Sequence, residues 1–242
     1  MTEYAVTVDL GKKHDRTVFM VLKDHVDIAP GATLAGQADR LQHTCQVPFI
    51  DQFSGVDYPT IVEHLATLMA TRELSNNADL LIDGRSMGEP VADMLVQAGL
   101  SPISIVATAG QEVHPVYSDF GKVFEQKGQA KFTGIRPVTQ YNVPKADLVE
   151  AGKKLMHTNR LMVARGLRWA EEFQRQLQHF KGVATQGGHR TYQADDEDIR
   201  DDIVFCYLMG AWWFIYTRKD AIIPSGPAAA ESAPDWDPLD FA

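Results

Sequence analysis

The chain has 242 residues, of which 45% are hydrophobic and 23% are charged, and its formal net charge is −9 at pH 7. This length and composition are typical of one globular domain with a sizeable core, and they exclude a chain that is disordered throughout. The sequence has no run of about 18 apolar residues and no signal-peptide pattern, so we expect neither a membrane-spanning nor a secreted protein. Cys45 and Cys206 lie in apolar surroundings without a zinc-type spacing, and we interpret them as buried reduced thiols of a cytosolic protein.

The negative net charge argues against a generally basic nucleic-acid binder, but the charge is unevenly distributed. Residues 121–190 contain 13 Lys and Arg against 5 Asp and Glu, a net charge of +8 that leaves −17 for the rest of the chain. A segment with this charge is suited to a polyanionic partner. The alternative is that these charges lie on solvated helix faces, which we favour for Arg175 and Lys181.

The first third of the chain has β-type patterns. In residues 4–9, the large side chains Tyr4, Val6 and Val8 alternate with Ala5, Thr7 and Asp9. A short polar loop with a glycine joins them to the β-rich run 17–21, which predicts a β-hairpin. Residues 24–37 contain Gly, Pro and Ala and are interpreted as a loop. Residues 41–50 have the pattern of a third strand. Together these segments predict an antiparallel meander.

The next segments alternate between helix and strand. The periodicity predicts a helix over residues 57–72, with Asp57 as its N-cap. A compact apolar strand follows at residues 78–83, a second helix starts near Pro90, and residues 102–107 form another buried strand. A meander followed by strand, helix and strand predicts a mixed α/β sheet.

The second half of the chain is less regular. Residues 131–141 are predicted to be either an extended hairpin or a loop that touches substrate. Later elements are a helix starting at Val143 and Pro144, an edge strand at 161–164, a helix bearing Trp169, Phe173, Leu177 and Phe180, a turn at 182–188, a short strand at 189–194 and an apolar helix at 203–216. Residues 221–242 are acidic and rich in Pro and Ala, so we expect a flexible tail behind a domain spanning residues 1–220.

Carboxylates stand at the ends of several of these elements. Asp9 and Asp83 each end a predicted strand, and Asp201 and Asp202 open the apolar helix as the last members of an eight-residue run with six carboxylates. An Asp at a strand end can simply cap a turn, and acids at a helix N-terminus are stabilised by the helix dipole, but capping does not need six. If the strand ends are adjacent and the helix packs across them, the carboxylates converge and repel one another.

Divalent cations would neutralise such a cluster. Ligands that are all oxygen atoms favour Mg²⁺ or Mn²⁺. Two such ions about 4 Å apart are a common arrangement for in-line attack on a phosphodiester.

Four segments of the sequence together resemble a known family. They are YAVTVDLG (residues 4–11), LLIDGRSMG (80–88), YNVPKADLV (141–149) and IRDDIVFCYLMGAWW (199–213). Their order and spacing are similar to those of the nuclease domain of the large terminase subunit of tailed bacteriophages. This resemblance implies an RNase H-like α/β fold, with a mixed central sheet flanked by helices.

The same resemblance implies a metal-dependent endonuclease that cuts concatemeric viral double-stranded DNA during genome packaging, in the cytoplasm of the infected bacterium. It implies that Asp9, Asp83, Asp201 and Asp202 are catalytic and hold Mg²⁺ or Mn²⁺, two ions in our interpretation, with Asp202 preferred over Asp201. The packaging ATPase, the small terminase and the portal are the implied protein partners.

The chain departs from the family in two places. It has no G-x-x-x-x-G-K-[ST] phosphate-binding loop, so we interpret it as the nuclease part without the packaging ATPase. In addition, Arg85 follows Asp83 and Gly84 where the family more often has small residues.

Basic residues near these motifs are candidates for DNA contact: Lys12, Lys13, Arg16, Lys131, Arg136 and Lys145. The three beside Asp9 either contact phosphates near the scissile bond or solvate a turn, and Lys145 either faces DNA or is an exposed lysine at a helix start. His14 and His189 are expected at the surface, with a supporting role beside Asp9 as a second option for His14.

Three other functions are weighed against the terminase nuclease. A Holliday-junction resolvase of the same fold would also use clustered acids, but would be a dimer and more basic. An actin-like ATPase or sugar kinase would place Asp9 near phosphates, but needs a second glycine-rich loop that residues 83–88 fit poorly. A non-catalytic DNA-binding or assembly module leaves the anchored acids unexplained.

Overall fold

The computed structural model describes residues 2–11, 15–28, 41–117, 125–126, 129–130, 139–184, 190–194 and 199–217. Its helices are α1 (Tyr58–Met69), α2 (Glu89–Gln97), α3 (Lys145–His157), α4 (Ala170–His179) and α5 (Asp202–Thr217). Its strands are β1 (Tyr4–Asp9), β2 (Arg16–Ile28), β3 (Leu41–Ser54), β4 (Ala78–Asp83), β5 (Pro102–Thr108), β6 (His114–Tyr117), β7 (Glu125–Gln126), β8 (Gln129–Ala130), β9 (Thr139–Pro144), β10 (Leu161–Val163), β11 (Phe180–Ala184) and β12 (Arg190–Ala194). No helix in these ranges has the length and apolar character needed to cross a membrane.

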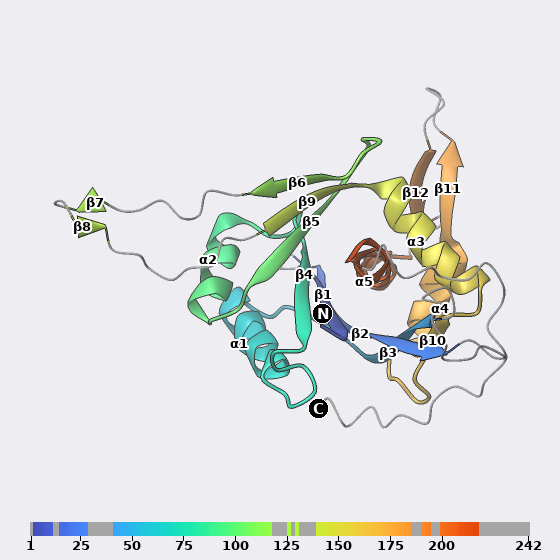
Figure 1. Cartoon of the computed structure of the whole chain (residues 1–242), viewed down its shortest axis with the longest axis horizontal. Helices are drawn as coiled ribbons and strands as arrows, with labels where there is room; N and C mark the ends of the chain where they lie inside the picture. Colours follow the sequence, from blue (N-terminus) through green and yellow to red (C-terminus); the bar gives the residue numbers. More distant parts are fainter. Residues whose placement is uncertain are drawn as a thin grey trace.

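The central sheet is mixed, with the strand order β10-β3-β2-β1-β4-β5-β9-β6. β1, β2 and β3 pair antiparallel, whereas β1, β4, β5 and β9 pair parallel to one another. The predicted meander, the parallel strands after it and the edge strand β10 are therefore confirmed. The described part of the chain has an RNase H-like α/β fold, with helices on both faces of this sheet (Figure 1).

The alternation of side chains in β1 divides the core into two layers. Tyr4, Val6 and Val8 pack with the apolar faces of α1 and α2. Ala5 packs on the opposite face, in the layer that contains α3 and α5. Figure 1 shows α1 and α2 on one side of the sheet and α5, seen end-on, between the sheet and α3 on the other. Because successive side chains alternate, Thr7 and Asp9 share the α5 side with Ala5.

α5 is the central helix of the second layer. Its residues from Ile203 to Phe214 are all buried, as expected of a helix that is apolar all round. It lies close to its neighbours: a Cβ atom at Gly210 would fall 2.6 Å from Leu22 Cδ1, and one at Gly152 of α3 would fall 2.3 Å from Leu208 Cδ2. The Tyr207 hydroxyl donates to the Gly152 carbonyl at 2.8 Å. These contacts fix the position of α5 against both β2 and α3.

The loop predicted from residue 24 is wrong in its first part, because β2 continues to Ile28. Its second half pairs with β3 from Lys23↔Gln46 to Ile28↔Leu41, after a register shift between Val21 and Lys23. Such a shift breaks the alternation of core-facing and outward-facing residues. The polar residues Lys23 and Asp24 after the apolar run therefore looked like the end of the strand. Asp24 is in fact buried.

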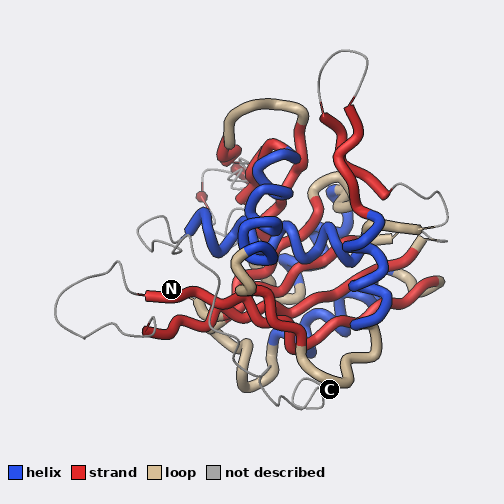
Figure 2. The backbone as a smooth tube through the Cα atoms, turned by 90° about the vertical axis from the view of Figure 1, so that its right-hand side faces the viewer, coloured by secondary structure: helices blue, strands red, loops and turns tan. Residues whose placement is uncertain are grey.

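The helix predicted to include Phe180 is also shorter than expected. The turn predicted over residues 182–188 is wrong at 182–184, which belong to β11, and residues 185–188 lie outside the described part of the chain. α4 ends at His179, and Phe180 starts β11, which pairs with β12 in a separate hairpin. Gly182 lies opposite Tyr192 in that hairpin, and a Cβ atom at Gly182 would lie 3.0 Å from the Tyr192 ring. The glycine therefore makes room for a ring instead of making a turn. The hairpin extends beyond α3 and away from the main sheet (Figure 2).

The remaining helix starts agree with the sequence. The Asp57 side chain accepts a hydrogen bond from Thr60 N at 3.1 Å and caps α1, and Pro144 stands at the N-cap position of α3. Both cysteines are buried and form no disulfide. The predicted tail, residues 221–242, and most of the segment 131–141 lie outside the described residues.

Candidate metal centre

Asp9 and Asp83 lie side by side at the ends of neighbouring strands. β1 and β4 are parallel, and Val8 pairs with Ile82, so each aspartate is the next residue along its strand. Paired strands are about 4.8 Å apart. Leu81 of β4 packs in the α5 layer, and Asp83, two residues later, lies on the same side of the sheet as Asp9.

α5 brings Asp202 to this edge of the sheet. At its far end, Trp213 Nε1 donates to Asp79 Oδ2 at 2.8 Å, near the start of β4. One turn after Asp202, Cys206 Sγ lies 3.8 Å from the carbonyl oxygen of Val18, and Val18 pairs with Asp9. Asp202, Cys206 and Trp213 share one helix face, because residues four and seven positions apart stack on an α-helix. The first turn of α5 therefore lies beside the ends of β1 and β4.

The charges of the other predicted acids act on Asp9. Burial raises the pKa of Asp9 well above its usual range, and the negative charges of Asp83, Asp202 and Asp201 raise this pKa further, while a hydrogen bond from Ser86 lowers it. The like charges act on Asp9 from β4 and from the start of α5 at once. The ionised form of Asp9 is thus disfavoured until a cation compensates it.

The turn after β4 holds Asp83 in place. Burial raises the pKa of Asp83, and the Arg85 backbone N–H, which donates to Asp83 Oδ1 at 3.0 Å, acts in the opposite direction, as do the charges of Arg85 and Lys145. The Arg85 guanidinium donates to the Ala107 carbonyl on β5. Ser86 Oγ donates to the Asp83 carbonyl at 2.9 Å and accepts from Leu10 N at 3.1 Å, which ties the ends of β1 and β4 together.

Asp202 has an unsatisfied oxygen. Its Oδ2 is buried and has no hydrogen-bond partner among the described residues. Burial raises the pKa of Asp202; the charge of Arg200 lowers it, that of Asp201 raises it and that of Arg16 lowers it. A buried carboxylate oxygen without a partner is costly, so it needs either a proton or a cation.

Two of the predicted basic residues are described, and both lie near the acids. Arg16 is exposed at the start of β2, and its charge acts on Asp202. Lys145 is half-buried at the start of α3; burial lowers its pKa, whereas the charges of Asp201 and Asp83 raise it. Its ammonium group lies 5.9 Å from the centre of the Phe180 ring. Of the two alternatives for Lys145, an exposed lysine at a helix start is therefore wrong. The other candidates, Lys12, Lys13, Lys131, Arg136, His14 and His189, lie outside the described residues.

The donor set fits a hard divalent cation. Asp9, Asp83 and Asp202 offer carboxylate oxygens only, burial raises the pKa of all three, and Asp202 Oδ2 is unsatisfied, so a bound cation would stabilise their ionised forms. In the described ranges, no three Asp, Glu, His or Cys side chains are gathered into a ready-made metal site. The acids are therefore neighbours on rigid elements without a preformed cage.

Sequence reasoning missed three residues that shape this centre: Arg85, Ser86 and Gln176. Arg85 was noted only as a departure from the family, and Ser86 stood in a predicted turn. Gln176 lies on α4, and its side-chain oxygen accepts hydrogen bonds from the backbone of α5. The signal for Ser86 was its place just after a strand end, and the signal for Gln176 was its helical spacing from Phe173 and Phe180, which places it on the apolar face of α4, unlike Gln174 and Gln178.

Comparisons with known proteins support the fold. No protein-family model and no curated protein matches the chain. The crystal structure of the large terminase nuclease from thermophilic phage G20c with bound magnesium matches with a TM-score of 0.52 and 17% identity, over 87% of this chain and 80% of that chain. The same nuclease with bound cobalt gives the same values. A further crystal structure of it gives a TM-score of 0.51 and 16% identity, over 90% and 82% of the two chains. At this identity the likeness concerns the fold, and at that level the resemblance seen in the sequence is confirmed.

Proposed function

We propose that the chain is a divalent-metal-dependent DNA endonuclease and that it cuts concatemeric viral DNA during genome packaging. Two observations support this proposal: Asp9 and Asp83 end neighbouring parallel strands on one side of the sheet, and the charge of Asp202 at the start of α5 acts on Asp9. The fold likeness to a phage terminase nuclease with bound magnesium supports it independently. The work of such an enzyme belongs in the cytoplasm of an infected bacterium.

In this proposal Asp9, Asp83 and Asp202 hold Mg²⁺ or Mn²⁺. Asp201, the residue directly before α5, adds negative charge. A bound divalent cation, or a pair of them, supplies a more acidic water and stabilises the charge on the leaving oxygen. The protein's part is to hold the carboxylates on rigid elements: the Arg85 backbone N–H orients Asp83, and Ser86 joins the two strand ends.

Positive side chains beside the acids would bind the phosphates of double-stranded DNA. Lys145 is half-buried between the acids and the Phe180 ring, which restricts its ammonium group to the site. Arg16 is exposed near Asp202. Lys12, Lys13, Lys131 and Arg136 remain proposed DNA contacts on the strength of the sequence alone. Contacts of this kind fix position rather than sequence preference.

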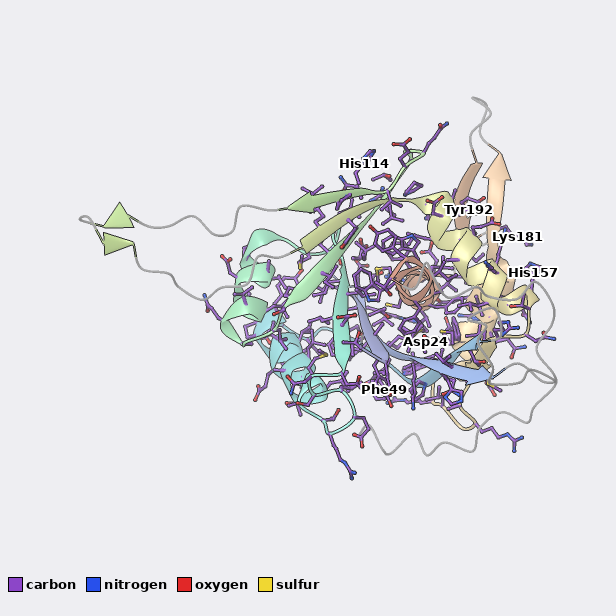
Figure 3. All side chains as sticks on the ribbon, viewed as in Figure 1. Asp24, Phe49, His114, His157, Lys181 and Tyr192 are labelled. Carbon is purple, nitrogen blue, oxygen red and sulfur yellow. The ribbon has the colours of Figure 1, made fainter. Side chains whose placement is uncertain are left out.

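A wider basic surface continues from Lys145. Lys153 lies 5.5 Å from the centre of the Tyr192 ring, and Lys181 of β11 and His157 at the end of α3 are exposed. Figure 3 shows Lys181, Tyr192 and His157 on the same side of the molecule, over α3 and the β11–β12 hairpin. This surface is suited to the DNA backbone beyond the cleavage site. The packaging ATPase, the small terminase and the portal are the protein partners that this function would require.

The test is nicking of supercoiled plasmid by the purified chain with Mn²⁺, Mg²⁺ or EDTA. We expect metal-dependent nicking, and a loss of at least about 100-fold in rate for Asp9→Asn and Asp202→Asn, since each removes a charged ligand. Asp93→Asn is the matched control, because Asp93 is exposed on α2, across the sheet. Nicking that persists in EDTA or in both site variants would contradict the proposal.

The same assay separates the alternatives. A resolvase would cut a four-way DNA junction much faster than plasmid, and it would run as a dimer in gel filtration. An actin-like ATPase or sugar kinase would bind and hydrolyse ATP, which this proposal does not expect because the chain has no G-x-x-x-x-G-K-[ST] segment.

A further inference from the structure

The first backbone amides of α5 are satisfied from another helix. The Phe205 N–H donates to the Asp201 carbonyl at 2.8 Å, which makes Asp201 the N-cap residue, and Ile203 and Val204 the second and third residues of the helix. An N-cap side chain normally accepts a hydrogen bond from the backbone N–H at one of these two positions. Here Gln176 Oε1 of α4 accepts both, at 3.0 Å from Ile203 N and 3.3 Å from Val204 N.

Gln176 is held for this task. Its side chain is 1% exposed, and its Nε2 donates to Glu172 Oε1 at 3.2 Å. Glu172 is in turn bound by Arg175, through Nε at 2.9 Å and Nη2 at 3.0 Å. Because the amide nitrogen has an acceptor on its own helix, the amide oxygen is directed toward α5. A glutamine at 174 or 178 could not do this, since both of those side chains are exposed.

The consequence concerns the two aspartates at the start of α5. An aspartate at the N-cap would ordinarily turn its carboxylate back to these amides, away from any ligand. With the amides already accepted by Gln176, neither Asp201 nor Asp202 is required for capping. Asp202 Oδ2 is buried without a hydrogen-bond partner among the described residues, and the charge of Asp201 acts on Asp9 and on Lys145.

We propose that Gln176 is a positioning residue that caps α5 from α4 and thereby leaves Asp201 and Asp202 free to face the cation. This inference rests on the proposed function. Without the Gln176 carbonyl, the acceptor that an N-cap residue ordinarily offers to the Ile203 and Val204 amides is its own side chain, so the Asp201 carboxylate would turn toward them. Divalent cations would then bind more weakly, although no proposed ligand had been changed.

The test measures Mn²⁺ binding directly, by the electron paramagnetic resonance signal of free Mn²⁺ during titration of the full chain. We expect Gln176→Met to raise the Kd about 10-fold, the range found when a group that orients a metal ligand is removed. Gln178→Met is the matched control, with the same substitution at an exposed position of the same helix, and should leave the Kd unchanged.

A rescue variant separates positioning from simple damage to the fold. The double substitution Glu172→Gln with Gln176→Glu keeps an oxygen acceptor for the α5 amides and a hydrogen bond between the two positions. It should bind Mn²⁺ within about 3-fold of the wild type, a difference small beside the 10-fold effect of losing an orienting group. If the rescue variant binds as weakly as Gln176→Met, the carbonyl is not what positions the ligands, and the inference is wrong.

A second measurement does not depend on Gln176→Met being folded. If the Asp201 side chain does not cap α5 in the wild type, Asp201→Ala and Asp201→Asn have the same thermal midpoint in the metal-free chain, because both remove the charge and only Asn keeps a capping oxygen. A midpoint of Asp201→Ala clearly below that of Asp201→Asn would mean that the side chain at 201 caps the helix, which overturns the inference. The two proposals also fail differently: a wild type that binds no Mn²⁺ refutes the proposed function, whereas equal binding by wild type and Gln176→Met refutes only the role of Gln176.

Discussion

Asp9 is the proposed ligand whose ionised form is most strongly disfavoured by its surroundings. It is a strand-end carboxylate that burial and three like charges act on in the same direction. A folded protein keeps such a residue only where something outweighs its cost, because an aspartate that merely capped a turn would be solvated. At the residue scale, the cost should therefore be measurable as a dependence of stability on pH.

Asp9→Asn should stabilise the metal-free chain at neutral pH. The pKa of Asp9 is raised on folding, so its contribution to stability is fully present below the unfolded-state pKa and is lost as pH rises through the raised folded-state pKa. Each unit by which the pKa is raised corresponds to about 1.4 kcal/mol. Thermal unfolding in EDTA should show the variant gaining on the wild type as pH rises from 4 to 8. A variant that is less stable at every pH would refute this account of Asp9.

Lys145 is the residue-scale test of DNA contact. Lys145→Gln should lower the rate of plasmid nicking about tenfold, equivalent to about 1.4 kcal/mol of transition-state stabilisation, because it removes a half-buried positive charge that acts on Asp83. Lys154→Gln, an exposed lysine on the same helix, should nick at the wild-type rate. Equal rates for all three proteins would assign Lys145 to packing against Phe180 alone.

The elements carry the site because three of them meet at one place. β1 and β4 each contribute an aspartate through their register, and α5 contributes its first turn because Trp213 and Cys206 fix its direction along the sheet. The close approach of α5 to α3 at Gly152 is part of that fixation. A larger residue at 152 should therefore destabilise the packing of α5 against α3 without contacting a proposed metal ligand.

Gly152→Ala should lower the free energy of unfolding by about 1–3 kcal/mol, the usual cost of an extra methyl group in a packed core. Its Cβ atom would fall 2.3 Å from Leu208 Cδ2 and 3.1 Å from the Tyr207 ring. Gly110→Ala is the control, since its Cβ atom would meet only Thr108 Oγ1, at 3.4 Å. Urea unfolding compares the two, and equal stability would show that α5 is not held tightly against α3.

Much of the element pattern could be predicted from the sequence, and the failures have local causes. The period-2 run that ends at Asp9 and the apolar run that ends at Asp83 are unambiguous, and so is the long apolar helix behind Asp202. β2 was cut short because its register shift breaks the alternation, and Phe180 continued the helical spacing of α4 although it starts a strand. The role of Gln176 could not be predicted, since its partner is backbone on a helix far along the chain.

At the scale of the whole molecule, the central sheet could be predicted from local patterns, whereas the acidic centre depends on contacts between segments far apart in the sequence. The meander and the parallel strands follow from local patterns, but the nearness of Asp9, Asp83 and Asp202 depends on strand order, which the sequence supplied only through its resemblance to a family. The uneven charge of the sequence corresponds to two regions of the fold, the acidic centre and the basic surface over α3 and the β11–β12 hairpin. In our proposal the acidic centre binds the cation, and the basic surface binds the DNA backbone beside it.

The most direct test of the central claim is to locate the ion. Anomalous diffraction from crystals soaked in Mn²⁺ should show one or two peaks at the ends of β1 and β4, with carboxylate oxygens of Asp9, Asp83 and Asp202 about 2.0–2.2 Å away, as oxygen ligands of such ions require. Crystals of Asp202→Asn should lose at least one peak. Peaks only elsewhere on the chain, or none at millimolar Mn²⁺, would contradict the account.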